Sequence, residues 1–239
     1  MFSHFNSYWE QLDTPLHTFK DEKGYKEYYK EISYLIEDKV NILDIGCGSG
    51  EFSALMLEQG KMITGVDFSE KMLSKARQVC NEYILAGRAK FINGDAKTVS
   101  SKLNGEKFDI IFSNGLLQYL SPSETKAFLL EMRSFLNDGG FIVMMNIPDI
   151  NYYDLFHAQF YENFLYPKSG ISLAIKLLFS VLKYRAMKVL IPNQWKQRQL
   201  GYWYSTTFFY SLSNMMNMTI ACKSSIFREY GYRFHIIIK

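Results

Sequence analysis

One ten-residue stretch constrains the fold of this chain more than any other, and it runs from Asn41 to Gly50. It reads NILDIGCGSG, so an apolar strand leads directly into Gly46, Gly48 and the final glycine. A helical pattern of apolar residues begins at Phe52, immediately afterwards. A strand, a glycine-rich turn and a helix form the first unit of a dinucleotide-type α/β fold. In such a unit the glycines let a ligand approach the backbone closely, and free N–H groups of the helix face that ligand.

The spacing of the glycines and the residue before them indicate which ligand the turn binds. A dinucleotide fingerprint has the spacing G-x-G-x-x-G, whereas this turn has G-x-G-x-G and follows Asp44. A carboxylate is a poor neighbour for a pyrophosphate, but it suits the ammonium and sulfonium of S-adenosylmethionine (SAM). The segment DIGCGSG resembles motif I of the class I SAM-dependent methyltransferases. The resemblance implies cofactor contacts from Asp44, Gly46, Cys47, Gly48 and Gly50.

A second acidic position follows one helix later. Asp67 comes directly after an apolar strand expected over Met62–Val66. An acidic side chain at the tip of the second strand can accept hydrogen bonds from both ribose hydroxyls of an adenosine. Phe68 is then placed to pack against the adenine. A helix expected over Ser69–Ala86 presents Met72 as its first inward residue.

Two later strand ends resemble the cofactor site of the same family. After the third predicted strand, Asp95 resembles the acidic residue that receives the adenine amino group, with the backbone of Ala96 beside the ring. A solvated turn residue is the alternative for Asp95, because Gly-Asp is common in turns. The apolar run Phe108–Ser113 fits a strand buried on both faces. The resemblance places the next residues, Asn114 and Gly115, beside the methionyl part of SAM and its transferring methyl group.

The expected chemistry is methyl transfer to oxygen by an enzyme. No Asn-Pro-Pro-Tyr or Asp-Pro-Pro-Tyr motif follows Ser113, which argues against the amino-methyltransferases of nucleobases and glutamine. A hydroxyl nucleophile benefits from a general base, and His157 is the histidine best placed to face the methyl group. The alternative for His157 is a surface or packing role. No carboxylate cluster suggests a metal ion, so none is expected.

The predicted fold class is α/β: a Rossmann-like, doubly wound, seven-stranded sheet with an antiparallel last strand, plus a helical cap insertion. Single helices are expected over Glu22–Glu37 and from Pro122 to about Asn137, and a fifth strand over Phe141–Asn146. In the N-terminal region, Tyr8, Trp9 or Tyr25 either closes over the cofactor or packs on the sheet edge. The expected regions are an N-terminal helical lid (1–39), the SAM-binding core (40–148), a basic and aromatic cap insertion (149–204), and a C-terminal helix and β-hairpin completing the core (205–239).

Charge is unevenly distributed, although the net charge is only +3. No Asp or Glu occurs between Asn163 and Arg228, a stretch with nine basic residues, whereas the rest of the chain has 18 basic and 24 acidic residues. Such a field favours anionic partners. The expected acceptor is therefore an anionic small molecule or glycan: a sugar phosphate, a nucleotide sugar or a lipid-linked saccharide. The stretch Leu200–Tyr204 is similar to small bacterial methyltransferases of surface-polysaccharide pathways, which suggests polysaccharide biosynthesis.

Two other functions remain open. An RNA methyltransferase would track phosphates with the basic stretch, and its binding would fall steeply with salt. No RNA-binding module is visible, so nucleic acid is the less favoured partner. A SAM-binding protein without catalysis is the second alternative, because the acidic residues alone do not exclude it.

The basic stretch contains a broad apolar helix, expected over Ile171–Leu182, with one polar stripe. This helix packs on the core, lines a pocket or subunit interface, or lies on a membrane through residues 171–191. The N-terminus lacks a signal-peptide pattern, and no apolar run reaches the roughly 18 residues of a membrane span. Three widely spaced cysteines fit a reducing compartment. The expected location is the cytoplasm, with peripheral membrane contact as the alternative.

Overall fold

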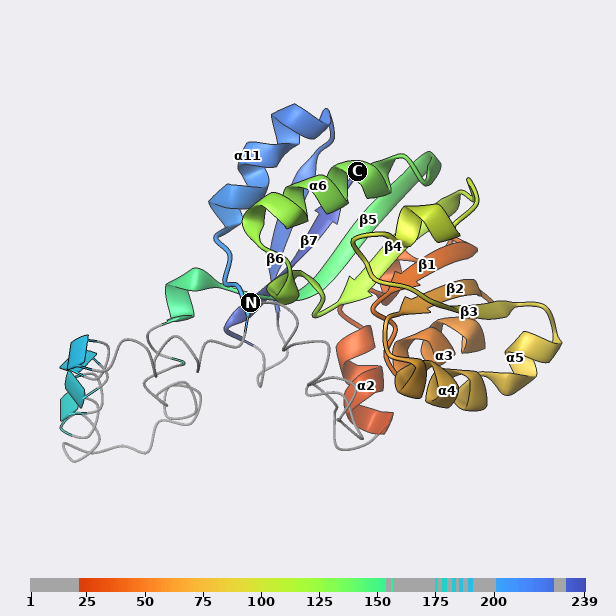
Figure 1. Ribbon diagram of the computed structural model, residues 1–239, viewed down its shortest axis with the longest axis horizontal. Coiled ribbons are helices and arrows are strands. Elements are labelled where there is room, and N and C mark those ends of the chain that lie inside the picture. Colours follow the sequence, from red (N-terminus) through yellow and green to blue (C-terminus); the bar gives the residue numbers. More distant parts are fainter. Residues whose placement is uncertain are drawn as a thin grey trace.

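One mixed sheet of seven strands organises the molecule (Figure 1). The computed structural model describes residues 22–153, 156, 201–225 and 231–239, and nine helical residues between 175 and 190. Within this part of the chain the strand order is β3-β2-β1-β4-β5-β7-β6; neighbours from β3 to β5 are parallel, and β7 is antiparallel to β5 and β6. The predicted fold class is confirmed. The strands are β1 (Asn41–Ile45), β2 (Met62–Asp67), β3 (Ala89–Asn93), β4 (Phe108–Asn114), β5 (Leu136–Pro148), β6 (Ile220–Ser224) and β7 (Arg233–Ile238).

Helices cover both faces of the sheet. Helices α2 to α5 lie on one face, and α6 and α11 lie on the other (Figure 1). The α-helices are α2 (Glu22–Tyr29), α3 (Glu51–Glu58), α4 (Glu70–Val79), α5 (Asn81–Leu85), α6 (Pro122–Arg133) and α11 (Thr206–Met216). Short 3-10 helices are η1 (Ser33–Leu35), η2 (Val99–Lys102), η3 (Leu117–Tyr119) and η4 (Ile150–Tyr152).

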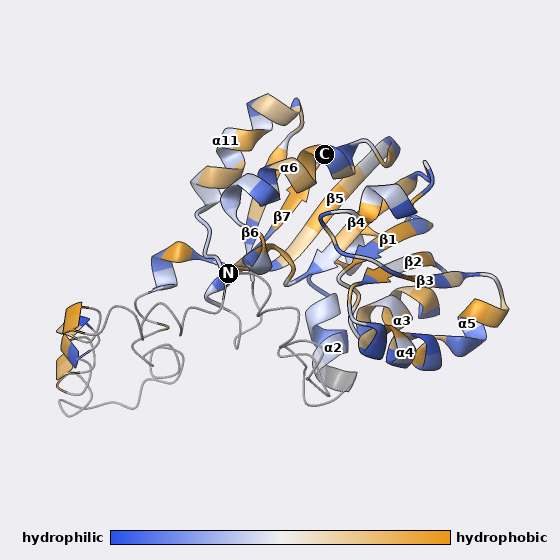
Figure 2. Cartoon of the chain, viewed as in Figure 1, coloured by the Kyte–Doolittle hydropathy of each residue, from blue (hydrophilic) through white to orange (hydrophobic). Residues whose placement is uncertain are grey.

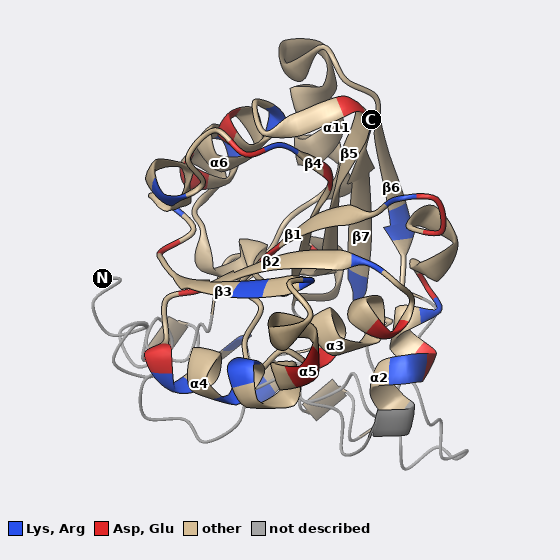
Figure 3. Ribbon diagram, turned by 90° about the vertical axis from the view of Figure 1, so that its right-hand side faces the viewer, with Lys and Arg blue, Asp and Glu red and all other residues tan. Residues whose placement is uncertain are grey.

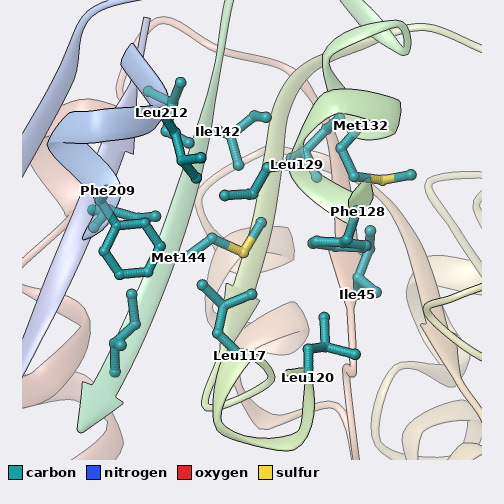
Figure 4. Packing of buried hydrophobic residues seen from close by; sticks show 14 of the residues in the cluster. Ile45, Leu117, Leu120, Phe128, Leu129, Met132, Ile142, Met144, Phe209 and Leu212 are labelled. Atoms are coloured by element: carbon teal, nitrogen blue, oxygen red, sulfur yellow. The ribbon is translucent and has the colours of Figure 1, made fainter. Parts of the chain in front are cut away.

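Alternate residues of each strand face two separate apolar cores. In β1, Ile42 belongs to the core beside α2, α3 and α4, whereas Leu43 belongs to the core beside α6 and α11. Figure 4 shows the second core, where Phe128 of α6 and Phe209 of α11 pack around Met144 of β5. The strands are largely apolar (Figure 2), and charged residues lie mostly on helices and turns (Figure 3). Because both faces are covered, the carboxyl ends of the parallel strands remain as the edge at which ligands bind.

The structure corrects the helix predicted over Glu22–Glu37, which is wrong as one element. Helix α2 ends at Tyr29, and only η1 follows. The break turns the Glu31 side chain into the interior, where its carboxylate lies 2.7 Å from the ring of His235 on β7. A tertiary contact thus overrides a helical sequence pattern.

The helix predicted over Ser69–Ala86 is also divided, because the chain turns at Cys80 between α4 and α5. The Cys80 side chain is fully buried, with its sulfur 3.9 Å from the carbonyl oxygen of Gly50. Ser69 caps α4 as predicted, since its hydroxyl accepts a hydrogen bond from the N–H of Met72. The start of the element was therefore readable from the sequence, whereas its break depends on packing.

Two boundaries around β5 differ from the prediction. Helix α6 ends at Arg133, short of the expected end near Asn137, and β5 begins at Leu136, before the expected start. Leu136 pairs with Phe108 at the start of β4, and the amide of Asn137 donates to the Asp109 carboxylate at 2.9 Å. Contacts with β4 therefore make these residues part of the sheet.

Candidate active site

A cavity opens at the carboxyl ends of β1, β2 and β4, beside the first turn of α3. Carboxylates and aromatic rings share its wall with glycine backbone, and none of the described residues that line it is a lysine or arginine. Open α/β sheets bind their ligands at this edge. The lining residues are Tyr25, Asp44, Gly46, Cys47, Gly48, Glu51, Phe52, Asp67, Phe68, Ser69, Met72, Phe112, Asn114, Gly115, Leu116 and Tyr119.

The glycine turn has a backbone that other residues rarely adopt. The φ angles of Gly46, Gly48 and Gly50 are 72°, 55° and 86°. The N–H of Gly48 donates to a carboxylate oxygen of Asp67 at 3.0 Å, which ties the turn to the end of β2. Gly50 has a packing role, because a Cβ there would lie 3.0 Å from the Cα of Ala76 on α4. The turn therefore holds β1, β2 and α4 in one arrangement beside the cavity.

Asp67 is held in place by the protein backbone. One carboxylate oxygen accepts from Gly48, and the other accepts from the N–H of Ser69 at 2.9 Å. Burial raises the pKa of the Asp67 carboxyl, while these N–H groups and that of Phe68 act in the opposite direction. Each carboxylate oxygen keeps a further lone pair for a hydroxyl donor. This geometry fits the predicted contact with a ribose.

Asp44 is the most deeply placed charge of the site, with 2% of its surface exposed. Its carboxylate accepts a hydrogen bond from the Ser53 hydroxyl at 2.6 Å. Burial, reinforced by the nearby carboxylates of Asp67 and Glu51, raises the pKa of the Asp44 carboxyl to about 7 against the effect of Ser53. Three acidic side chains around one cavity favour a ligand that carries positive charge, because a cation stabilises their ionised forms.

Aromatic side chains form the apolar wall of the cavity. The ring of Phe52 on α3 lies edge-on to Tyr25 of α2, with 5.7 Å between centroids, and 5.8 Å from the ring of Phe112 on β4. Helix α2 therefore supplies part of the wall from the N-terminal region. Burial raises the pKa of the Cys47 thiol well above its usual value, so Cys47 is a packing group and not a reactive nucleophile.

Two asparagines lie near the carboxyl ends of β4 and β5. Asn114 lines the cavity and pairs in the sheet with Met145, the residue before Asn146. The Asn114 oxygen Oδ1 and both polar side-chain atoms of Asn146 are buried without a hydrogen-bond partner in the described part of the chain. Asn146 also has a φ of 64°. Unpaired buried amides and left-handed backbone are destabilising, and they concentrate at functional sites.

A buried polar network anchors α2 to the sheet. The His235 ring nitrogen Nε2 lies 2.7 Å from a Glu31 carboxylate oxygen, and the Ser225 hydroxyl donates to the other oxygen at 2.9 Å. The His235 nitrogen Nδ1 accepts from the N–H of Asn146 at 3.1 Å. Because Nδ1 is an acceptor, the ring hydrogen lies on Nε2 and is donated to Glu31. Both ring nitrogens are engaged, so His235 has no free position for a catalytic proton.

Most of the predicted cofactor residues line the cavity, whereas Gly50, Asp95 and Ala96 do not. Asp95 is exposed, and its carboxylate accepts from the N–H of Lys97 at 2.9 Å. Ala96 packs against the core beside α6. Contacts of Asp95 and Ala96 with adenine stay predictions. His157 lies outside the described residues, and no group of His, Cys, Asp or Glu in the described part is arranged to hold a metal ion.

Several residues that line the cavity were not predicted from the sequence. Glu51 and Phe52 directly follow the glycine turn, so their position in the first helical turn was an available signal. Phe112 lies two residues before Asn114 on the same strand, and the period of two in a strand places both on one face. Leu116 carried no distinguishing signal, and the sequence predicted Ser69 only as the start of a helix.

Comparison with known proteins adds a family to this geometry. A methyltransferase-domain model matches residues 42–140. A malonyl-[acyl-carrier protein] O-methyltransferase of Paenibacillus sp. (strain JDR-2) is 29% identical over 159 residues, covering 65% of this chain and 52% of the relative. A phosphoethanolamine N-methyltransferase of Arabidopsis thaliana is 30% identical over 101 residues, covering 42% of this chain and 20% of the relative. The chain thus spans about half, or less, of the length of these curated relatives.

Solved structures share the fold over nearly the whole chain. The magnesium protoporphyrin IX methyltransferase of Synechocystis PCC 6803 with bound SAM has a TM-score of 0.59 at 15% identity, covering 99% of this chain and 91% of its own. A protein of Pyrococcus horikoshii OT3 has a TM-score of 0.65 at 20% identity, covering 98% of both chains. At these identities the likeness shows the fold alone. The matched family model spans the strands that build the cavity, so residues 42–140 are similar to a methyltransferase domain, and the fold is the one shared by SAM-dependent methyltransferases of known structure.

Proposed function

We propose that this chain transfers the methyl group of SAM to an oxygen atom of an anionic small molecule or glycan. One observation carries the proposal: a glycine turn with positive φ angles and two buried acidic residues, Asp44 and Asp67, surround one cavity. The acidic side chains suit the cationic groups of SAM and its ribose.

The protein's part in this reaction is to position groups. SAM supplies an electrophilic methyl group, so the chain needs to bind it, exclude water and hold the acceptor in line. The aromatic rings around Phe52 give the cavity an apolar wall, which disfavours water beside the reacting groups. Asp67 and Phe68 are proposed to hold the adenosine, and Asn114 and Gly115 to border the methyl group. His157 stays the proposed base.

Two observations support an anionic acceptor that carries hydroxyl groups. The stretch from Asn163 to Arg228 has nine basic residues and no acidic ones, and its charge favours a phosphate-bearing partner. The unpaired Asn114 oxygen belongs to a residue that lines the cavity, and it matches a hydroxyl because an amide oxygen accepts hydrogen bonds. The proposed acceptors are sugar phosphates, nucleotide sugars and lipid-linked saccharides, which would place the enzyme in polysaccharide biosynthesis.

The relatives are named for transfer to oxygen and to nitrogen. We favour oxygen because no Asn-Pro-Pro-Tyr or Asp-Pro-Pro-Tyr motif follows Ser113. A chain that bound SAM without turnover would instead be a regulator. An RNA methyltransferase would modify RNA with an affinity that falls steeply with salt.

The proposed location is the cytoplasm, with contact to a membrane surface through residues 171–191. Among the helices that the structure describes, none is long and apolar enough to cross a membrane. The apolar and basic composition of this segment supports peripheral contact. Such contact would suit a lipid-linked acceptor.

The test is methyl transfer from isotope-labelled SAM to a panel of sugar phosphates, nucleotide sugars, lipid-diphosphate-linked glycans and RNA. We expect label in one of the first three classes, and none with the Asp67→Ala variant. Label in RNA alone, or SAM binding without label in any class, would contradict the proposed acceptor and support one of the two alternatives.

A further inference from the structure

Strand β5 contains a bulge near its carboxyl end, where it lies beside β7 (Figure 1). The register between the two strands shifts between Met144 and Ile147, so two residues of β5 face the single residue His235 of β7. The second of these two is Asn146, whose φ angle of 64° lies in the left-handed region. A bulge changes the direction of side chains in a strand, and bulges are frequent next to active sites.

The bulge lies beside the wall of the cavity. Met145, the residue before Asn146, pairs in the sheet with Asn114, and its carbonyl oxygen accepts from the N–H of Gly115 at 3.0 Å. Both Asn114 and Gly115 line the cavity, and neighbouring strands lie about 4.8 Å apart. Asn146 is therefore the next residue beyond the cavity wall on the adjacent strand.

Two buried side chains of β7 hold the backbone of Asn146 in this conformation. Its N–H donates to the His235 nitrogen Nδ1 at 3.1 Å, and its carbonyl oxygen accepts from Nη1 of Arg233 at 2.8 Å. The same guanidinium donates to the side-chain oxygen of Gln118 at 3.4 Å, and the Gln118 amide donates to the carbonyl of Gly115 at 2.9 Å. A strained conformation persists where its surroundings fix it. This network fixes Asn146 relative to the cavity wall.

The side-chain amide of Asn146 takes no part in this network. The residue is 1% exposed, and neither its amide nitrogen nor its amide oxygen has a hydrogen-bond partner in the described part of the chain. An unsatisfied buried amide and a left-handed backbone both destabilise the folded state. Glycine at this position would avoid both effects. An asparagine that is held here at the expense of stability fits a group that binds a ligand.

We propose that the Asn146 amide binds neighbouring hydroxyl groups of a saccharide acceptor and thereby helps to determine which acceptor is methylated. The inference deepens the proposed function and rests on it, because that function places the methyl group beside Asn114 and Gly115. One hydroxyl donates to the amide oxygen, and the hydroxyl next to it accepts from the amide nitrogen. A fully ionised phosphate group only accepts hydrogen bonds, so it would leave the amide oxygen unpaired.

Glycine at position 146 separates the role of the amide from that of the backbone. Asn146→Gly permits the left-handed conformation and removes the unpaired amide, so we expect its melting temperature to exceed that of the unchanged chain by at least about 2 °C. The matched control is Asn217→Gly, because Asn217 also has a left-handed backbone, with a φ angle of 48°, but is exposed at the end of α11. We expect a smaller change for this control.

Calorimetric titration with S-adenosylhomocysteine tests whether the amide serves the cofactor instead. We expect the Asn146→Gly variant and the Asn217→Gly control to bind S-adenosylhomocysteine as the unchanged chain does, since the proposed partner of the amide is the acceptor. Neither this titration nor the melting temperature depends on methyl transfer.

The acceptor contact is tested with labelled SAM and the panel of sugar phosphates, nucleotide sugars and lipid-diphosphate-linked glycans. For the compound that the unchanged chain methylates, we expect Asn146→Gly to raise KM at least about tenfold. Single-deoxy analogues of that compound then identify the contact. Removal of a contacted hydroxyl should raise KM for the unchanged chain but not for the variant.

Four results would overturn the inference. A melting temperature of Asn146→Gly below that of the unchanged chain, or failure of this variant to fold, would show that the amide supports the fold. Weaker binding of S-adenosylhomocysteine would assign the amide to the cofactor site. Unchanged KM, or equal effects of every deoxy analogue on both proteins, would remove Asn146 from the acceptor site. These results leave methyl transfer itself standing, whereas absence of label in the whole panel would contradict the proposed acceptor and this contact together.

Discussion

The ionised Asp44 side chain is unfavourable for folding but favourable for binding a cation. Its carboxylate is buried, and beside it lie the acidic groups of Asp67 and Glu51. In the folded chain these surroundings disfavour the ionised form, which is the form that attracts a cation. A residue that destabilises the fold in this way has a function to serve, and the cavity supplies a reason for it.

We predict that Asp44→Asn stabilises the ligand-free protein and weakens SAM binding. The pKa of the Asp44 carboxyl is about 7 in the folded chain against an ordinary value of 3.8. The folded state therefore keeps this proton where the unfolded chain has released it, so the free energy of unfolding falls as pH rises from about 4 to about 7. Above pH 7 the variant should be more stable by about 1 to 3 kcal/mol.

Urea unfolding of both proteins from pH 5 to pH 8, with calorimetric titration of SAM, checks this prediction. The stability difference should shrink as pH falls below 7, since the Asp44 carboxyl is then neutral like the amide. A variant that is less stable than the unchanged chain at pH 8, or that binds SAM equally well, would contradict the assigned role.

We predict that Asp67→Ala weakens SAM binding by more than about tenfold, because a buried pair of hydrogen bonds to a carboxylate contributes roughly 1.5–3 kcal/mol. The matched control is Asp38→Ala, which removes an exposed carboxylate outside the cavity. Calorimetry measures both dissociation constants. Equal affinity of the Asp67→Ala variant and the control would remove Asp67 from the cofactor site.

At the scale of the element, the N-terminal region is fastened to the sheet by a buried carboxylate. Glu31 lies two residues beyond the end of α2, and its carboxylate hydrogen-bonds to His235 of β7 and to Ser225. The same region brings Tyr25 to the wall of the cavity. The packing of a distant strand thus fixes the part of α2 that a cofactor would contact.

We predict that Glu31→Ala destabilises the protein by about 2 to 4 kcal/mol, because it leaves the buried donors of His235 and Ser225 without their acceptor. It should also weaken SAM binding through Tyr25. Glu27→Ala is the control, since its ion pair with Lys30 is exposed and contributes about 0 to 1 kcal/mol. Chemical unfolding and calorimetry report the two effects. Equal stability of the two variants would show that the network does not hold α2.

Gly50 begins α3 and packs against Ala76 of α4, so its replacement adds crowding to backbone strain. Gly50 and Gly60 have φ angles of 86° and 84°, but a Cβ meets Ala76 at 3.0 Å only at Gly50 and meets nothing within 4 Å at Gly60. We expect Gly60→Ala to cost about 1 kcal/mol from strain and Gly50→Ala about 2 to 3 kcal/mol. Thermal unfolding measures both. Equal losses would mean that the packing of α3 against α4 tolerates the added carbon.

The sequence predicted those features that depend on local pattern. The turn at Gly46 to Gly50 was readable because its glycines, the strand before it and the helix after it are contiguous. The end of α2 was not readable, since it depends on Glu31 reaching a strand far along the chain. Asp95 could not be separated from an ordinary turn residue, because its hydrogen bond with Lys97 lies within such a turn.

At the scale of the whole molecule, opposite charge is divided between two regions. The cavity has acidic side chains at the carboxyl edge of the sheet, whereas the stretch from Asn163 to Arg228 has nine basic residues and no acidic ones. This division of charge fits the proposal that a cationic cofactor and an anionic acceptor bind to different parts of the chain.

The most direct test of this account is calorimetric titration of the purified chain with S-adenosylhomocysteine, with NAD as the control ligand. We predict micromolar binding of the former and none of the latter, because the acidic cavity suits a methionyl nucleoside and not a pyrophosphate. Binding of NAD, or equal affinity of the unchanged chain and the Asp67→Ala variant for S-adenosylhomocysteine, would contradict the assignment of the cavity to SAM.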